Sequence, residues 1–359
     1  MFLFAAIRCL QSLLNQTYEH FEVICVLNGC TDNTEELCLS FKSQFAEKGL
    51  MLKVLVLVAS GLVEALQAGL AVVGESSVYV SRLDVDDRVI SPLHLVRQVE
   101  FLDANPHINV LGTQSFLTDD LSAAGNTAGS ASMCVAMGIP THPVLVQWEM
   151  MFRCVILHPT VMLRRNVVES CGGYGNHFSL ESNCAEDYVL WARILQSHPF
   201  SVANLAQVDV CIFQHADSKS SIERATSRVE ELKIQWCLAK SLLTKDLILP
   251  GAELFAIFSR LHNPEHVSSL SEIKEVCKMI HLLHENFVAT IPTVFLGDDV
   301  LFILKESKIK IAVSFLRKCV HLFSVEGVLD ELAMLDISPA LLLKHQISFN
   351  LNVEELTSA

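Results

Sequence analysis

The sequence predicts an α/β protein with a mainly parallel sheet, followed by an α-helical module. Up to residue 226, apolar runs of strand length alternate with segments of helical periodicity, a pattern typical of parallel sheets covered by helices. From Ser227 onward, helical periodicity continues almost to the end of the chain with few strand signals. We therefore expect two domains, residues 1–226 and residues 227–359, which a chain of 359 residues can accommodate.

The period of the apolar residues predicts each element in turn. Residues 9–16 carry leucines on one helical face, and the apolar run over residues 21–27 is typical of a buried strand. Thr31 or Asp32 can cap the helix that follows the turn at Asn28. Further strands are expected over residues 54–58, 77–83 and 160–163 and near residue 108, and helices over residues 61–73, 91–102 and 143–152 and from residue 185. Small polar residues predict a surface loop over residues 117–132.

Three carboxylates occur within four residues directly after the strand predicted at residues 77–83. Asp84 and Asp86 are two residues apart, so on an extended chain they point to the same side, with Asp87 beside them. Their oxygens can converge on a hard cation such as Mg²⁺ or Mn²⁺, and such a cation can bind a diphosphate. The alternative is a solvated acidic turn, because turns favour aspartate.

A second pair of carboxylates, Glu186 and Asp187, opens a predicted helix far along the chain. Adjacent carboxylates can raise the pKa of one of them, which helps a general base. The alternative is that both residues only favour the helix N-terminus through its dipole.

Composition excludes several classes of protein. The net charge is −14 and there is no block of Lys or Arg, which argues against a nucleic-acid-binding surface. No apolar run reaches the roughly 18 residues of a membrane-spanning helix, so we expect no transmembrane segment. The twelve cysteines form no C-x-x-C pair, which disfavours a zinc site or a disulfide framework and predicts a reducing, cytoplasmic location. A dehydrogenase is disfavoured because the G-x-G-x-x-G fingerprint is absent.

Taken together, the N-terminal segments resemble, in order, the motifs of a family 2 glycosyltransferase with the GT-A fold, a nucleotide-diphospho-sugar transferase. The resemblance extends over residues 9–224, about 60% of the chain. The matching segments are residues 10–24, 29–34 and 61–70, Arg-Leu-Asp-Val-Asp-Asp at 82–87, His-Pro-Thr-Val-Met-Leu-Arg-Arg at 158–165 and Ala-Glu-Asp-Tyr-Val-Leu-Trp at 185–191.

The resemblance implies metal-dependent, inverting transfer of a single sugar. The donor would be a nucleotide-diphosphate sugar, with a UDP-sugar expected, the acceptor a hydroxyl of a glycan or another molecule, and the cofactor Mn²⁺ or Mg²⁺. The roles implied are Asp86 as metal ligand, Asp84 as ribose contact or second metal ligand, Asp87 as support for that shell, Asn28 as contact to the base, Asp187 as general base and Glu186 as its partner.

Three further residues are placed by the resemblance, each with a structural alternative. His215 follows the last core strand and could approach the metal or phosphates, although a lone His is more often structural or exposed. His158 could line the acceptor pocket or pack under the sheet. Trp191 lies one helical turn after Asp187 and could stack on a sugar ring, although we favour a place in the core.

Two departures from the family pattern bear on function. Relatives begin with a strand that touches the nucleotide base, and here only residues 1–8 precede the first helix, so we expect that strand to be missing or degraded. The alternative function is therefore a catalytically inactive, glycosyltransferase-like protein whose helical C-terminal part engages a partner. The Q-x-x-R-W motif of processive synthases is absent, which favours transfer of a single sugar.

Overall fold

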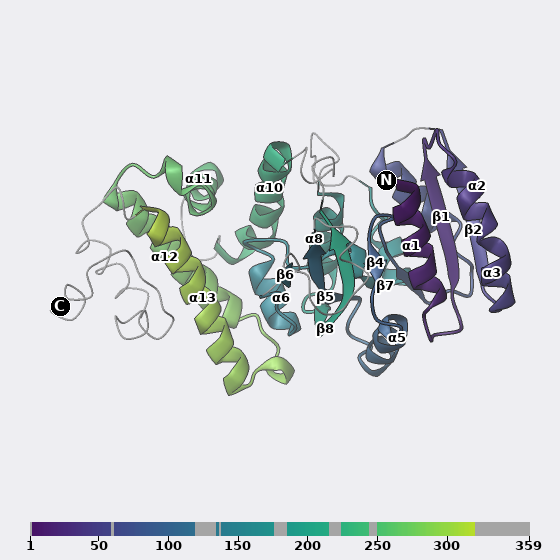
Figure 1. The fold of residues 1–359 in the computed structure, drawn as a ribbon. Coiled ribbons are helices and arrows are strands. Elements are labelled where there is room, and N and C mark those ends of the chain that lie inside the picture. The colour runs from purple at the N-terminus through teal and green to yellow at the C-terminus, as the bar shows by residue number, and fades with distance from the viewer. Residues whose placement is uncertain are drawn as a thin grey trace. The chain divides into compact units, whose positions relative to one another are not determined.

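The computed structural model describes residues 2–58, 61–118, 134–135, 138–175, 185–214, 224–243 and 250–319 (Figure 1). The chain divides into two compact units, Met1–Ile234 and Gln235–Ala359. The division falls within helix α10 (Arg224–Leu243), which also runs through the boundary expected between residues 226 and 227. The predicted division into domains 1–226 and 227–359 stays a prediction.

The first unit begins with a small parallel sheet and the helices around it. β1 (Glu22–Asn28) pairs with β2 (Met51–Leu57) along its whole length, from Glu22 opposite Met51 to Asn28 opposite Leu57. The surrounding helices are α1 (Phe2–Leu14), α2 (Thr34–Ser40), α3 (Lys42–Glu47) and α4 (Leu62–Ala71). Leucine and phenylalanine side chains, among them Leu10, Leu27 and Phe45, fill the core between strands and helices. Helix α1 begins earlier than predicted because the apolar residues before Cys9 continue its buried face.

The N-cap of α2 is Asn33, so the prediction that Thr31 or Asp32 caps this helix is wrong, although Asp32 still contacts the first residue of the helix. Asp32 Oδ1 accepts a hydrogen bond from the backbone N–H of Thr34 at 3.2 Å and one from the Thr34 hydroxyl at 2.5 Å. The carboxylate thereby satisfies one of the backbone donors that a helix start leaves without an intrahelical partner.

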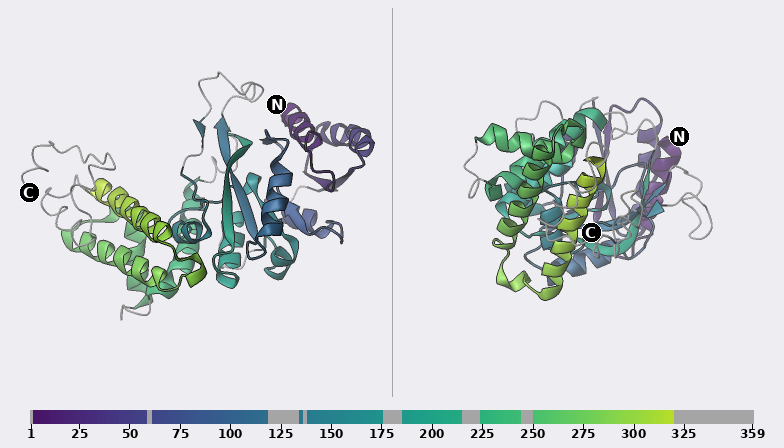
Figure 2. Two further views of the ribbon diagram at one scale, coloured as in Figure 1. Left: turned by 90° about the horizontal axis from the view of Figure 1, so that it is seen from below. Right: turned by 90° about the vertical axis from the view of Figure 1, so that its left-hand side faces the viewer.

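The larger sheet of the first unit has the strand order β3-β7-β5-β8-β4, with β6 on the free part of β5. Its long strands can be seen in Figure 1 and, from below, in Figure 2. Its strands are β3 (Tyr79–Ser81), β4 (Arg88–Val89), β5 (Val110–Thr118), β6 (Cys134–Val135), β7 (Met162–Arg164) and β8 (Val202–Phe213). The long pair β5–β8 is parallel, and the short pairs β3–β7, β4–β8, β5–β6 and β5–β7 are antiparallel. The sheet is therefore mixed, and the expected parallel arrangement holds for β1–β2 and β5–β8.

Helices and a short 3₁₀ turn pack against this sheet. They are α5 (His94–Ala104), α6 (Pro143–Glu149), the turn η2 (His158–Thr160), α7 (Arg165–Ser170) and α8 (Glu186–Ser197). α8 buries an almost continuous face that includes Tyr188, Trp191 and Ile194, so its first turn is held firmly. Strand β5 extends through Thr118, and most of the loop predicted at 117–132 lies outside the described residues.

The described part of the second unit, residues 235–243 and 250–319, is helical, as predicted from periodicity. Its elements are α11 (Gly251–His262), η3 (Pro264–His266), α12 (Leu270–Val288), η4 (Thr293–Phe295) and α13 (Asp298–Cys319). Ser269 and Glu272 form a capping box at the start of α12, in which each side chain accepts a hydrogen bond from the other residue's backbone N–H. Among the described residues, no helix combines the length and apolarity needed to cross a membrane.

Candidate active site

The three adjacent aspartates lie in a β-turn between β3 and β4. The backbone N–H of Asp87 donates to the carbonyl oxygen of Asp84 at 3.1 Å, which closes the turn. One carboxylate oxygen from each of Asp84, Asp86 and Asp87 lies within 4.8 Å of the others. The predicted convergence of these side chains is thus present, but the reason given for it was wrong: the chain is folded back here, and turn geometry brings the carboxylates together rather than the alternation of an extended strand.

Asp87 is the most deeply buried of the three. Its side chain is 3% exposed, and its Oδ1 accepts a hydrogen bond from the backbone N–H of Phe213, at the end of β8, at 2.8 Å. Burial, and then the neighbouring carboxylates of Asp84 and Asp86, raise the pKa of Asp87 to about 8. A cation bound at the turn would favour the ionised form of this carboxyl.

Arg82 is a buried cation between the two groups of carboxylates. Its guanidinium forms a two-pronged ion pair with the carboxylate of Asp84, and its side chain is only 11% exposed. Its backbone N–H donates to the carbonyl of Val161 at 3.1 Å, which fixes the residue at the end of β3. Burial alone would lower the pKa of Arg82, but the Asp84 carboxylate outweighs that effect and holds the pKa above its ordinary value. No role was predicted for this residue from the sequence, although its position directly before Leu83-Asp84 was a signal.

Asp187 occupies the first turn of α8, where Ala185 enters the helix with φ 63°. Burial, and then the charge of Glu186, raise the pKa of Asp187 to about 7, while the backbone N–H of Tyr188, which donates to its Oδ1 at 2.7 Å, and the charge of Arg82 act in the opposite direction. Arg82 thus acts electrostatically on both Asp187 and the acidic turn. The two carboxylate motifs, about one hundred residues apart in the chain, therefore lie within electrostatic range of the same guanidinium.

His158, Tyr174 and Trp191 form a buried aromatic cluster in the first unit. The hydroxyl of Tyr174 lies 2.9 Å from His158 Nε2, and the edge of the His158 ring meets Trp191 with 5.9 Å between ring centroids. Trp191 has no exposed surface, so its predicted role of stacking on an acceptor sugar is wrong, and its place in the core is confirmed. His158 is 8% exposed and packs in the same cluster, which agrees with the packing alternative for that residue. The reason is local: a buried tyrosine hydroxyl needs a hydrogen-bond partner, and His158 provides it.

Two further residues, Asn28 and His215, were predicted as part of this site. Asn28 ends β1 in the two-stranded sheet, where the next residue, Gly29, donates its backbone N–H to Leu57 at 3.1 Å. Its contact with a nucleotide base stays a prediction. His215 lies outside the described residues, so its predicted approach to the metal or phosphates also stays a prediction.

Comparisons with known proteins find glycosyltransferases among the relatives of this chain. Residues 6–128 match the sequence model of glycosyl transferase family 2, so this region is similar to members of that family. An uncharacterized glycosyltransferase of Haemophilus influenzae is 28% identical over 220 residues, which cover 59% of this chain and 62% of that protein. The O-antigen biosynthesis glycosyltransferase WbnJ of Escherichia coli is 28% identical over 192 residues, 53% of this chain and 66% of that one.

Two further comparisons concern proteins of other lengths or lower similarity. The bifunctional glycosyltransferase pgtA of Dictyostelium discoideum is 23% identical over 218 residues, 55% of this chain but 27% of that protein. The crystal structure of S. aureus TarS superposes with a TM-score of 0.47 at 17% identity, over 87% of this chain and 86% of that one. The chain thus spans between about a quarter and two thirds of the length of the curated relatives named here.

The acidic turn has the donor set of a divalent-cation site. Its three carboxylates offer only oxygen ligands, which Mg²⁺ and Mn²⁺ prefer, and one oxygen of each lies within 4.8 Å of the others. Asp84, Asp86 and Asp87 are the residues that would hold the ion. Arg82 orients Asp84 from behind, as a hydrogen-bonded second layer commonly orients metal ligands.

Proposed function

We propose that this chain transfers a single sugar, with inversion, from a nucleotide-diphosphate donor to a hydroxyl of a glycan or another acceptor. The donor we expect is a UDP-sugar, and the cofactor Mn²⁺ or Mg²⁺. The observation that supports the proposal is that the buried Arg82 pairs with Asp84 of the acidic turn and acts electrostatically on Asp187. A site for a diphosphate-bound cation and a general base are the two groups that such a transfer requires.

Asp187 would act on the acceptor. In the transfer, the acceptor oxygen forms a bond to the anomeric carbon while the bond from that carbon to the donor phosphate oxygen breaks, and the hydroxyl proton passes to a base. With a pKa raised to about 7, Asp187 is partly ionised at neutral pH and holds a proton more strongly than an ordinary aspartate. Glu186 contributes to that pKa through its adjacent charge.

The acidic turn would act on the departing nucleoside diphosphate. A divalent cation bound there supplies the positive charge that stabilises the leaving diphosphate. Asp87 stays in place because it is anchored to the backbone of Phe213, and Asp84 because it is paired with Arg82. The name of the E. coli relative, which refers to O-antigen biosynthesis, supports a glycan as the acceptor.

A turnover assay tests the proposal. The intact protein would be incubated with Mn²⁺ and a panel of UDP-sugars, and release of UDP measured with and without hydroxyl acceptors. We expect Asp86→Asn to abolish turnover, and the matched change Asp299→Asn, at an exposed position in α13, to leave it unchanged. Absence of turnover with every donor, or full activity of Asp86→Asn, would contradict the proposal. Tight UDP binding without turnover would instead support the alternative of a catalytically silent binding protein.

A further inference from the structure

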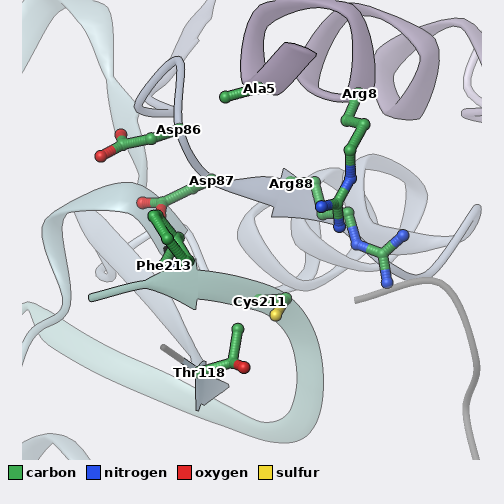
Figure 3. A pocket seen from close by; sticks show the side chains of 8 residues that line it. All are labelled: Ala5, Arg8, Asp86, Asp87, Arg88, Thr118, Cys211 and Phe213. Carbon is green, nitrogen blue, oxygen red and sulfur yellow. Dashed lines mark hydrogen bonds between the residues drawn. The ribbon is translucent and has the colours of Figure 1, made fainter. Parts of the chain in front are cut away.

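A small pocket opens beside the acidic turn, between α1, β4 and the end of β8. Its lining includes Asp86 and Asp87 as well as two arginines, Arg8 from α1 and Arg88 from β4. Figure 3 shows the two carboxylates on one side of the pocket and both guanidinium groups on the other. The proposed cation site and a pair of fixed positive charges therefore border the same space.

The side chains of the two arginines line the same side of this pocket. The Nε atom of Arg88 is buried and has no hydrogen-bond partner among the described residues. Two like charges held together, one of them with an unused buried donor, are stabilised when an anion binds between them.

The backbone around the arginines is firmly held. Arg88 pairs with Cys211 of β8 in the sheet, and the backbone N–H of the next residue, Val89, donates to Ser12 Oγ of α1 at 3.2 Å. Cys9, also on α1, donates its thiol to the carbonyl of Asp84 at 3.6 Å. Helix α1 is thus attached to both ends of the acidic turn. These hydrogen bonds hold α1, and with it Arg8, opposite the carboxylates.

We propose that Arg8 and Arg88 bind the diphosphate of the donor on the side opposite the cation. The inference rests on the proposed function and deepens it, because it assigns α1 and β4 to the donor site. A diphosphate presents more oxygens than one cation can neutralise, and guanidinium groups bind phosphate oxygens with two parallel hydrogen bonds. The charge on the diphosphate grows as the sugar departs, so both arginines stabilise the leaving group as well as the bound donor.

Calorimetric titration of the full chain in the presence of Mn²⁺ tests this assignment. The probes are UDP, inorganic pyrophosphate and uridine, and the variants are Arg8→Gln, Arg88→Gln and Arg88→Lys. The control is Arg153→Gln, which removes an exposed arginine that pairs with Glu149, one helical turn away, and donates to the carbonyl of Gly138. We expect each Gln variant to weaken UDP and pyrophosphate binding by about tenfold or more, the usual effect of losing hydrogen bonds to a charged group. Uridine binding and the control should not change, and Arg88→Lys should fall between Arg88→Gln and the intact chain.

The outcomes separate this inference from the proposed function. If the intact chain binds UDP and both Gln variants bind it equally well, the inference is wrong and the proposed function stands. If UDP and uridine binding fall by the same factor, the arginines support the fold rather than the phosphates, and the inference is also wrong. If the intact chain binds neither UDP nor pyrophosphate and releases no UDP from any donor, both fail. Should Arg88→Gln not fold, as judged by its melting curve, Arg8→Gln decides.

Discussion

Asp187→Asn is expected to stabilise the protein at alkaline pH while abolishing transfer. The folded state raises the pKa of this carboxyl from 3.8 to about 7, so between these pH values the folded chain holds a proton that the unfolded chain has lost. Stability conferred by the protonated group is present below pH 3.8 and is lost as the pH rises through 7. At about 1.36 kcal/mol for each unit of pKa, the loss is at most about 4 kcal/mol at pH 8 and about 2 kcal/mol near pH 5.5.

The amide of asparagine cannot ionise, so it avoids this loss, and its Oδ1 can still accept the hydrogen bond from Tyr188. Thermal unfolding of the intact chain and of Asp187→Asn at pH 4, 5.5 and 8 measures the difference. We expect equal stability at pH 4 and a melting temperature higher by several degrees for the variant at pH 8, at about 2–4 °C per kcal/mol. Asp299→Asn, exposed in α13, serves as the control. A variant that is no more stable than the intact chain at pH 8 would refute the assignment of a raised pKa.

Three further predictions follow from the same contacts. The acid limb of kcat/KM should rise through about pH 7 because Asp187 must be ionised to accept a proton, and Glu186→Gln, which removes a charge that raises that pKa, should move the limb to lower pH. Asp209→Asn should lower the free energy of unfolding by about 3 kcal/mol in denaturant titrations. Asp209 is 2% exposed and its Oδ1 lies 2.6 Å from Arg97 Nη1, so the change leaves the guanidinium without its buried counter-charge. Trp191→Ala should cost about 3–5 kcal/mol of stability. Trp191→Phe, a milder change, should leave KM for the acceptor unchanged. An increase in that KM would contradict the conclusion that Trp191 does not stack on the acceptor sugar.

Much of the α/β pattern could be predicted because it depends on local periodicity. The runs that became β1, β2 and β7 are short and apolar, and α8 was predicted from its opening carboxylates and its spacing. Strand direction could not be predicted in the same way. β4 has only two residues, Arg88 and Val89, and its antiparallel place beside β8 depends on partners more than one hundred residues away. The short antiparallel pairs of the larger sheet were therefore missed.

For the site, sequence alone predicted the carboxylates of the candidate site and the family that the chain resembles. Asp84, Asp86 and Asp87 are neighbours in the chain, so any compact turn brings them together, and the family match covers them. Tertiary structure decided which other groups act on those carboxylates. Arg82 acts on Asp187, and Arg8 lies opposite Asp86, only because separate segments pack together, and burial then amplifies charges that water would otherwise screen.

Burial also decided against Trp191 as a sugar-stacking residue. Its spacing from Asp187 shows that both lie on one side of α8, but spacing does not show whether that side is open to solvent. The packing of His158 and Tyr174 against the helix closes it. Local sequence thus specifies the chemical groups of this protein, whereas the environment that gives each group its pKa and its access to substrate arises only when distant segments fold together.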